Sequence, residues 1–251
     1  MLASRRRGAQ DSLNIVEAII KSGSILGINV KNGHGLTALA HAASSGSKET
    51  VTKLLGVEGV DCNCVDSMGR TPLMLAAKRG NNDVVALILE LEGIKIDSRD
   101  NEGKTALAHA VSSRKAGAFE ALLKVDSISA DYTTSGGLTF LMLAAGSGNA
   151  TNVRDVLQQA EFDINARDMH GCTALAHAVK AYLKMKGVGV HCVDKEGMTL
   201  RDSGLDVVST LLRIPGIDCS IRDVKGRTPL MVAKEEDNQE TMELLKKAGG
   251  Y

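Results

Sequence analysis

The chain has 251 residues, enough for one large domain or two ordinary ones with a substantial core. Its 30 basic residues balance its 30 acidic ones, so the net charge of zero gives no general grip on nucleic acid. No apolar run approaches the roughly 18 residues of a membrane-spanning helix. Aromatic residues make up only 2% and tryptophan is absent, which favours many thin alanine- and leucine-rich layers over one bulky core.

The N-terminal segment differs from the rest of the chain. Residues 1–10, "MLASRRRGAQ", carry three consecutive arginines without the apolar segment of a signal peptide, and we expect a disordered basic tail. Residues 11–32 contain an amphipathic pattern without a partner helix, which predicts an N-terminal capping helix. Five cysteines without a CxxC pair predict reduced thiols and a cytoplasmic protein, with the nucleus as the alternative compartment.

One short phrase returns along the remainder of the chain. Its threonine stands at positions 37, 71, 105, 139, 173 and 228, so four intervals of 34 residues precede one of 55. A fixed period of this size predicts a stack of similar units in a single domain over residues 11–251. The expected units are 33–66, 67–100, 101–134, 135–168, 169–223 and a C-terminal capping unit at 224–251.

Each unit has the same predicted parts. A turn such as "DSMG" comes first, and the threonine after it suits a helix N-cap, with Pro72 and Pro229 at the first helical position of two units. A short alanine-rich helix is followed by a second turn and a longer amphipathic helix, such as "NDVVALILE" from Asn82. An extended return such as "GVDCNCVD" closes the unit. Neither helix can bury its apolar face alone, so successive units must stack.

These features resemble the ankyrin repeat from about residue 11 to the end of the chain. The resemblance implies an all-α fold, an ankyrin-repeat solenoid of stacked helix-turn-helix units with β-hairpin-like turns. The period of 34 departs from the usual value of about 33. Alanine or methionine, such as Met74 and Ala108, replaces the family histidine that braces neighbouring turns, which predicts less rigid turns. Tetratricopeptide repeats share the period but lack the Gly-Thr turn and the extended return.

The units alternate between two types. Those at Thr37, Thr105 and Thr173 read "TALAHA", whereas the other three carry "LM" in their first helix. The long interval has two explanations, either two shortened repeats or one repeat with 21 extra residues at about 185–204. The alternation favours the second, with a first helix running through "KAYLKMK", a second helix from near Leu205 and a protruding loop between them.

Three histidines recur at matching positions, His41, His109 and His177. Neighbouring helices lie roughly 10 Å apart, so these side chains are separated by two layers. Zinc requires its nitrogen ligands within about 2 Å, which excludes a shared metal site. We therefore expect the histidines to serve in helix packing.

The cysteines are the remaining candidates for chemistry. Cys62 and Cys219 occupy equivalent positions of the return segments, where a small buried filler is expected, and Cys64 lies beside the first of them. Cys172 adjoins a turn, and we expect it to be partly exposed and the most reactive thiol. No nucleophile motif, phosphate-binding loop or acid–base pair accompanies these residues. We therefore expect no enzyme, no catalytic residue, no metal and no cofactor.

What remains is a recognition surface. In ankyrin-like stacks the turn tips and the exposed ends of the first helices line a concave groove, and the resemblance places the partner-binding residues there. Transferred unit by unit, these are Ser67, Met68, Arg70, Lys78, Arg79, Asn101, Glu102, Lys104, Met169, His170, Lys225 and Arg227.

The favoured function is a non-catalytic protein–protein interaction scaffold. A basic cluster in the second unit predicts a protein partner with an acidic segment, bound by a monomer, without nucleic acid or membrane. The alternative is a regulator or inhibitor of an enzyme, or the interaction arm of a larger polypeptide.

Overall fold

A computed structural model describes residues 27–113, 116–125, 132–159, 161–185 and 200–249. The chain divides into two compact units, Met1–Asp126 and Ser127–Tyr251. Over the described residues all regular secondary structure is helical, and no strand occurs. Three predicted segments lie outside the described residues. They are the basic tail, residues 11–26 of the capping helix and residues 186–199 of the insertion.

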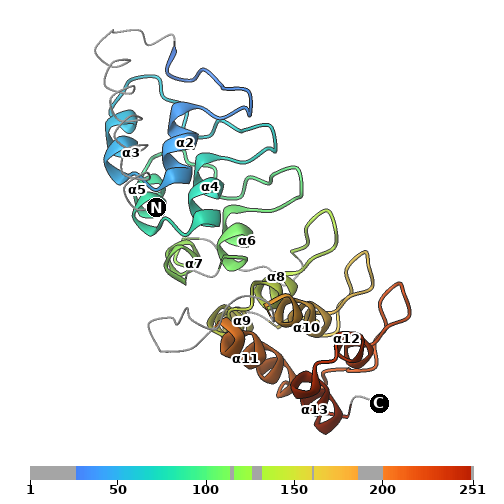
Figure 1. The fold of residues 1–251 in the computed structure, drawn as a ribbon. Coiled ribbons are helices and arrows are strands. Elements are labelled where there is room, and N and C mark those ends of the chain that lie inside the picture. Colours follow the sequence, from blue (N-terminus) through green and yellow to red (C-terminus); the bar gives the residue numbers. More distant parts are fainter. Residues whose placement is uncertain (1–26, 114–115, 126–131, 160, 186–199, 250–251) are drawn as a thin grey trace. The chain divides into compact units, whose positions relative to one another are not determined.

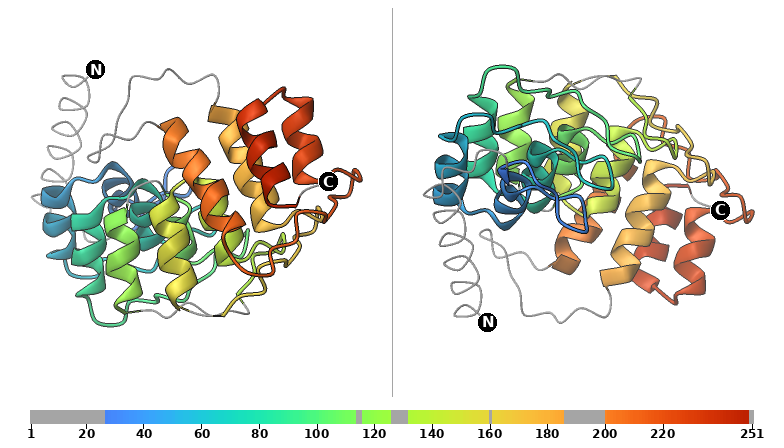
Figure 2. Two further views of the ribbon diagram at one scale, coloured as in Figure 1. Left: turned by 90° about the horizontal axis from the view of Figure 1, so that it is seen from below. Right: turned by 90° about the horizontal axis from the view of Figure 1, so that it is seen from above.

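The first unit contains three pairs of short antiparallel helices within its described part (Figure 1). They are α2 (Ala38–Ser45) with α3 (Lys48–Leu55), α4 (Pro72–Arg79) with α5 (Asn82–Leu89), and α6 (Ala106–Val111) with α7 (Ala116–Leu123). The first helices α2, α4 and α6 lie side by side in one layer, and α3, α5 and α7 form a second layer against them (Figures 1 and 2).

The second unit repeats this arrangement with longer helices. It contains α8 (Phe140–Ser147) with α9 (Ala150–Gln159), α10 (Ala174–Met185) with α11 (Leu200–Leu212), and α12 (Pro229–Glu235) with α13 (Gln239–Lys247). Here α10 lies between α8 and α12, and α11 lies between α9 and α13.

The predicted threonine caps explain where the first helices begin. Thr71 has extended backbone angles and its hydroxyl accepts a hydrogen bond from the Met74 amide, which satisfies an N–H that the helix leaves unpaired. The same bond recurs at Thr37, Thr105, Thr139 and Thr228. At the other end, Gly80 ends α4 with φ of 62°, a conformation in which a residue with a Cβ is strained.

Small side chains let the first helices approach closely. Ala76, Ala77 and Ala108 are fully buried between neighbouring first helices, and the aliphatic residues of the second helices, such as Val85 and Ile88, close the other side of each layer. The core is therefore a row of thin layers with few rings, as the composition indicates.

Asparagines of the return segments join successive repeats. The Asn63 amide donates to the Gly93 carbonyl at 2.9 Å while its oxygen accepts from the Lys95 amide at 2.9 Å. Asn29 and Asn165 form the same pair of bonds to the repeats that follow them. Each asparagine side chain bonds a backbone carbonyl and a backbone amide of the neighbouring return segment, which would otherwise lack a hydrogen-bond partner.

Among its described residues, the enlarged repeat has one helix pair, α10 and α11, on either side of residues 186–199. Helix α10 runs on to Met185, as "KAYLKMK" predicts, and in this extension the Tyr182 hydroxyl donates to Glu240 of α13 at 2.8 Å. Helix α11 begins at Leu200, five residues before the expected Leu205. The residues ahead of Leu205 contain no proline and begin with leucine and arginine, two good helix formers, so the helix extends toward its N-terminus.

None of the described helices combines the length and the apolar character needed to cross a membrane.

Candidate functional site

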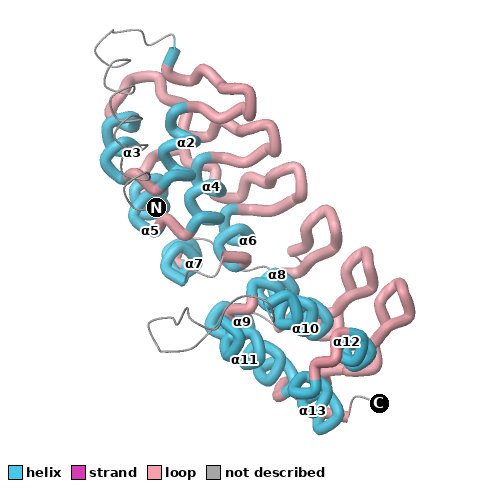
Figure 3. Tube along the Cα trace, in the orientation of Figure 1, coloured by secondary structure: helices cyan, strands magenta, loops and turns pink. Residues whose placement is uncertain are grey.

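The turns ahead of the first helices project as loops from one side of each unit (Figure 3). Four of these turns are built on a buried aspartate. One carboxylate oxygen of Asp66 accepts hydrogen bonds from the backbone amides of Met68 and Arg70, both at 2.9 Å. Asp100, Asp168 and Asp223 accept the same two bonds from the residues two and four positions later. All four aspartates are buried, so this oxygen fixes the turn from inside.

The second carboxylate oxygen takes a cation or an imidazole, according to the type of unit. In two of the three units with "LM", an arginine four residues later binds it: Arg70 reaches Asp66 at 2.6 and 2.8 Å, and Arg227 reaches Asp223 at 2.9 and 3.2 Å. The third of these units has Thr134 in place of the aspartate. In two of the three "TALAHA" units a histidine nine residues later binds it instead. These bonds are His109 to Asp100 at 2.8 Å and His177 to Asp168 at 2.9 Å.

These bonds bear on the prediction of less rigid turns, which stays a prediction. His109 and His177 brace the turn of their own unit, although each stands one position after the family histidine. His41 is different, because its unit has Asn32 in place of the aspartate and the His41 side chain is exposed. The expected packing role therefore fails for His41, whose partner residue is absent.

The burial and charges of these pairs shift the pKa values. Burial alone would raise the pKa of Asp223, but hydrogen bonds from the Arg227 amide and guanidinium and from Lys225 lower it to about 2. The same balance lowers the pKa of Asp66 and Asp168. A lowered carboxyl pKa stabilises the fold above about pH 4, and this contribution disappears as the pH falls toward about 2.

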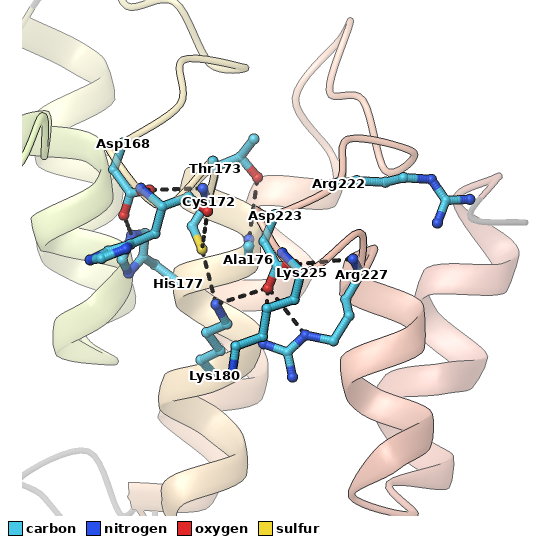
Figure 4. A network of polar contacts seen from close by, with 12 residues as sticks. Asp168, Cys172, Thr173, Ala176, His177, Lys180, Arg222, Asp223, Lys225 and Arg227 are labelled. Carbon is cyan, nitrogen blue, oxygen red and sulfur yellow. Dashed lines mark hydrogen bonds and ion pairs between the residues drawn. The ribbon is translucent and has the colours of Figure 1, made fainter.

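A lysine links two successive turns of the second unit (Figure 4). The Lys180 ammonium on α10 lies 2.9 Å from Cys172 Sγ and 3.6 Å from the Asp223 carboxylate of the next repeat. Cys172 is only 3% exposed, which contradicts the expected partial exposure of this thiol. The turn folds its side chain inward against Lys180, so the cysteine helps to hold the turn.

The other described thiols are also packed. Cys64 Sγ lies 3.2 Å from the Thr37 hydroxyl, and burial raises the pKa of Cys62, Cys64 and Cys219. Across the described residues, no group of three or more histidine, cysteine, aspartate or glutamate side chains could hold a metal ion.

The partner-binding residues predicted in the first unit fall into two groups. Lys78 and Arg79 are exposed at the end of α4. The exposed residues of the two turn tips are Ser67 and Met68 in one turn and Asn101 and Glu102 in the next. The tips are joined, since the Asn101 amide donates to the Met68 carbonyl at 3.0 Å. Arg70 is instead half-buried on Asp66, and Lys104 pairs with Glu102 at 2.8 Å.

In the second unit, Met169, His170 and Lys225 are exposed at neighbouring tips. The Val224 amide donates to the His170 carbonyl at 2.9 Å, which joins these tips as in the first unit. Arg227 is committed to Asp223 and to Glu235, the latter at 2.9 Å. The predicted residues thus divide into exposed tip residues and cations that hold the turns.

Sequence reasoning missed the aspartate partners of the turns and the contact between Lys180 and Cys172. The spacing of four residues from aspartate to arginine, or nine to histidine, was a readable signal for the first. The second depends on how a turn folds onto the next helix, which spacing alone does not reveal.

Paired helices with threonine caps, extended returns and projecting turns define a helical repeat protein of the ankyrin type. The family model "Ankyrin repeats (3 copies)" matches residues 1–100 and, in an overlapping match, residues 42–135, which together span more than half of the chain. The chain belongs to the ankyrin repeat family.

Solved structures show the same fold. One is a complex of the predatory endopeptidase Bd0816 from Bdellovibrio bacteriovorus with immunity protein Bd3460, which contains a chain 29% identical to this one. The TM-score is 0.62, and the match covers 87% of this chain and 99% of that chain. An ankyrin repeat domain from Acinetobacter baumannii is 22% identical, with a TM-score of 0.61 and coverage of 84% and 97%.

The ankyrin repeat domain of Bcl-3, described as a unique member of the IkappaB protein family, is 22% identical, with a TM-score of 0.60 and coverage of 98% and 96%. No curated protein sequence matches the chain. Ankyrin repeats are typically non-catalytic modules that mediate protein–protein interaction.

Proposed function

We propose that this protein is a non-catalytic scaffold that binds a partner protein through its turn tips and the exposed ends of its first helices. The observation that carries this proposal is the construction of the turns. Buried aspartates hold the backbone amides of Met68 and His170 at the turn tips through bonds of 2.9 and 2.8 Å, respectively. A surface ordered before binding loses little conformational entropy on association, so even a modest contact area can bind a partner.

The proposed contacts are unequal in what they offer a partner. The residues that are exposed and can contact a partner are Ser67, Met68, Asn101, Glu102, Lys78, Arg79, Met169, His170 and Lys225. Arg70, Lys104 and Arg227 act mainly by holding the tips, because their charges are already paired. We expect a protein partner with an acidic segment that faces Lys78 and Arg79, bound by a monomeric chain.

A second candidate function is inhibition or regulation of an enzyme. The observation that favours it is the 29% identical chain found in the complex of an endopeptidase with an immunity protein. Purification of the full chain from its own cells separates the candidates. One enzyme recovered in equal amount, with its activity reduced, supports regulation, whereas several partners of unequal amount support a scaffold.

Charge reversal at the end of α4 tests the proposed surface. The variant Lys78→Glu/Arg79→Glu changes two exposed cations and leaves the bond between Arg70 and Asp66 intact. We expect its affinity for the purified partner to fall about ten-fold and the salt dependence of binding to flatten, because long-range attraction is lost.

The matched control is Lys48→Glu/Lys124→Glu, which reverses two exposed lysines on the second-helix side of the same unit. Its affinity should stay within about two-fold of the wild type, as for surface changes outside a binding site. Equal loss in both double variants, or no loss in either, would contradict the proposed surface.

A further inference from the structure

Two neighbouring turn tips of the second unit form one exposed surface. We call it the distal tip patch, and it consists of the exposed residues Arg167, Met169, His170, Arg222, Val224 and Lys225.

Two large apolar side chains are exposed in this patch. Met169 and Val224 are 68% and 67% exposed, and they occupy equivalent positions of their turns. Three of the other units have a polar residue at this position, Ser67, Asn101 or Ser135, and the first unit has Gly33. Valine and methionine are poor choices for an exposed turn, and neither buries its side chain against this chain. Their position therefore favours contact with another molecule.

The polar residues of the patch give it a positive charge. The acids of these two turns, Asp168 and Asp223, are buried and use both carboxylate oxygens within the fold. Among the residues that the structure describes, none forms an ion pair with Arg167, Arg222 or Lys225. The exposed charge beside Met169 and Val224 is thus basic and uncompensated.

The patch is also ordered before any partner arrives. The Met169 amide donates to the Gly136 carbonyl at 3.0 Å and the Val224 amide to the His170 carbonyl at 2.9 Å. The Arg167 guanidinium donates to the Arg222 carbonyl at 2.9 Å, which ties the two tips together. In Figure 4, Arg222 extends away from the polar network around Lys180, and its guanidinium donates to the Gly226 carbonyl at 2.6 Å.

We propose that the distal tip patch binds an acidic segment of a partner protein that also carries large apolar side chains. The segment would place its apolar groups on Met169 and Val224 and its carboxylates on Arg222, Lys225 and Arg167. This inference rests on the proposed binding function and names the partner chemistry at these two tips. Nucleic acid fits less well, because phosphates gain nothing from exposed methionine and valine and the chain has no net positive charge.

A displayed library of random peptides of about 12 residues, selected on the full chain, tests the proposal directly. We expect the enriched peptides to be rich in aspartate and glutamate and to contain large apolar residues. Their affinity, measured by fluorescence anisotropy, should fall about ten-fold in Met169→Ser/Val224→Ser and again in Lys225→Glu. Binding should also weaken as NaCl rises from about 50 to about 500 mM.

A matched pair of controls comes from the first unit. Val125 is 52% exposed and follows the exposed Lys124, so Val125→Ser and Lys124→Glu repeat the same chemical changes away from the turn tips. Both should leave the affinity for the selected peptides within about two-fold of the wild type.

Several outcomes would overturn the proposal. The selected peptides could lack an acidic bias, or no peptide could be enriched at all. The selected peptides could also bind the tip variants as tightly as the wild type, or a DNA duplex could bind more tightly and compete with them. Selected peptides that lose affinity with Lys78→Glu/Arg79→Glu but not with the tip variants would refute this patch while supporting the proposed function. Insensitivity to both sets of changes would count against both.

Discussion

At the scale of single residues, four turns depend on one buried aspartate and on the side chain that donates a hydrogen bond to it. Two of these turns use an arginine in the turn, and the other two use a histidine on the following helix. Both leave the carboxylate with hydrogen bonds on each oxygen, as a buried charge requires. Units that differ in sequence therefore present turns of the same shape.

Removal of a histidine should destabilise the fold where an aspartate faces it. We expect His109→Ala to lower the free energy of unfolding by about 1–3 kcal/mol, because Asp100 is left buried with an unpaired oxygen. Urea unfolding followed by circular dichroism measures this. His41→Ala is the control, since His41 is exposed, and it should change stability by less than about 0.5 kcal/mol. Equal losses in the two variants would refute the bracing role.

The same histidines predict a pH dependence. Burial lowers the pKa of His109 and His177 below the value of 6.5, against the opposing attraction of their aspartates. Below about pH 6.5 the unfolded chain binds protons that the folded chain does not. The free energy of unfolding therefore decreases as the pH is lowered. The midpoint of urea unfolding should decrease between about pH 7.5 and pH 5.5. The decrease should be smaller in His109→Gln/His177→Gln, and an unchanged decrease would disprove this assignment.

At the scale of elements, most helix boundaries followed from local signals. Threonine caps, proline at the first position and glycine after the last residue predicted the helices of the regular units, and helix α4 begins and ends where they indicate. The start of α11 at Leu200 was not predicted, because the amphipathic pattern of the second helix begins only at Leu205. A helix can extend beyond its amphipathic segment when the residues permit it.

The last repeat contains one strained helix end. Asp237 has φ of 48°, at the position where α4 has Gly80 with φ of 62°. A residue with a Cβ is strained in this region, so Asp237→Gly should raise the free energy of unfolding by about 0.5–1 kcal/mol. Thermal unfolding of the full chain measures the change. Gly80→Asp is the converse variant and should be destabilising, and a loss of stability in Asp237→Gly would contradict the strain.

At the scale of the whole molecule, the repeat period predicted the stacked fold and the motifs within each unit predicted the family, and both are confirmed. The period could predict stacking because each unit needs its neighbours to bury its helices. It predicted the candidate site only as a set of tip positions. Which cations are free and which are committed to the turns depends on side-chain contacts, as Arg70 on Asp66 and Lys78 in solvent show.

The last repeat shows how the stack changes at its outer layer. Lys234 is exposed at the position where the corresponding Ala77 is fully buried under the next first helix. Met231 is likewise 40% exposed, whereas the corresponding Met74 is buried. A charged side chain in place of alanine suits a face that meets water, which accords with the proposed role of residues 224–251 as a capping repeat.

Binding of the partner by the turn tips and the ends of the first helices can be tested directly. The measurement is hydrogen exchange of the full chain with and without its purified partner, followed by mass spectrometry. We expect slower exchange in peptides that cover residues 67–70, 78–79, 101–104, 169–170 and 224–227, with little change in α3, α5, α9 and α13. Protection confined to these second helices, with unchanged exchange at the tips, would contradict it.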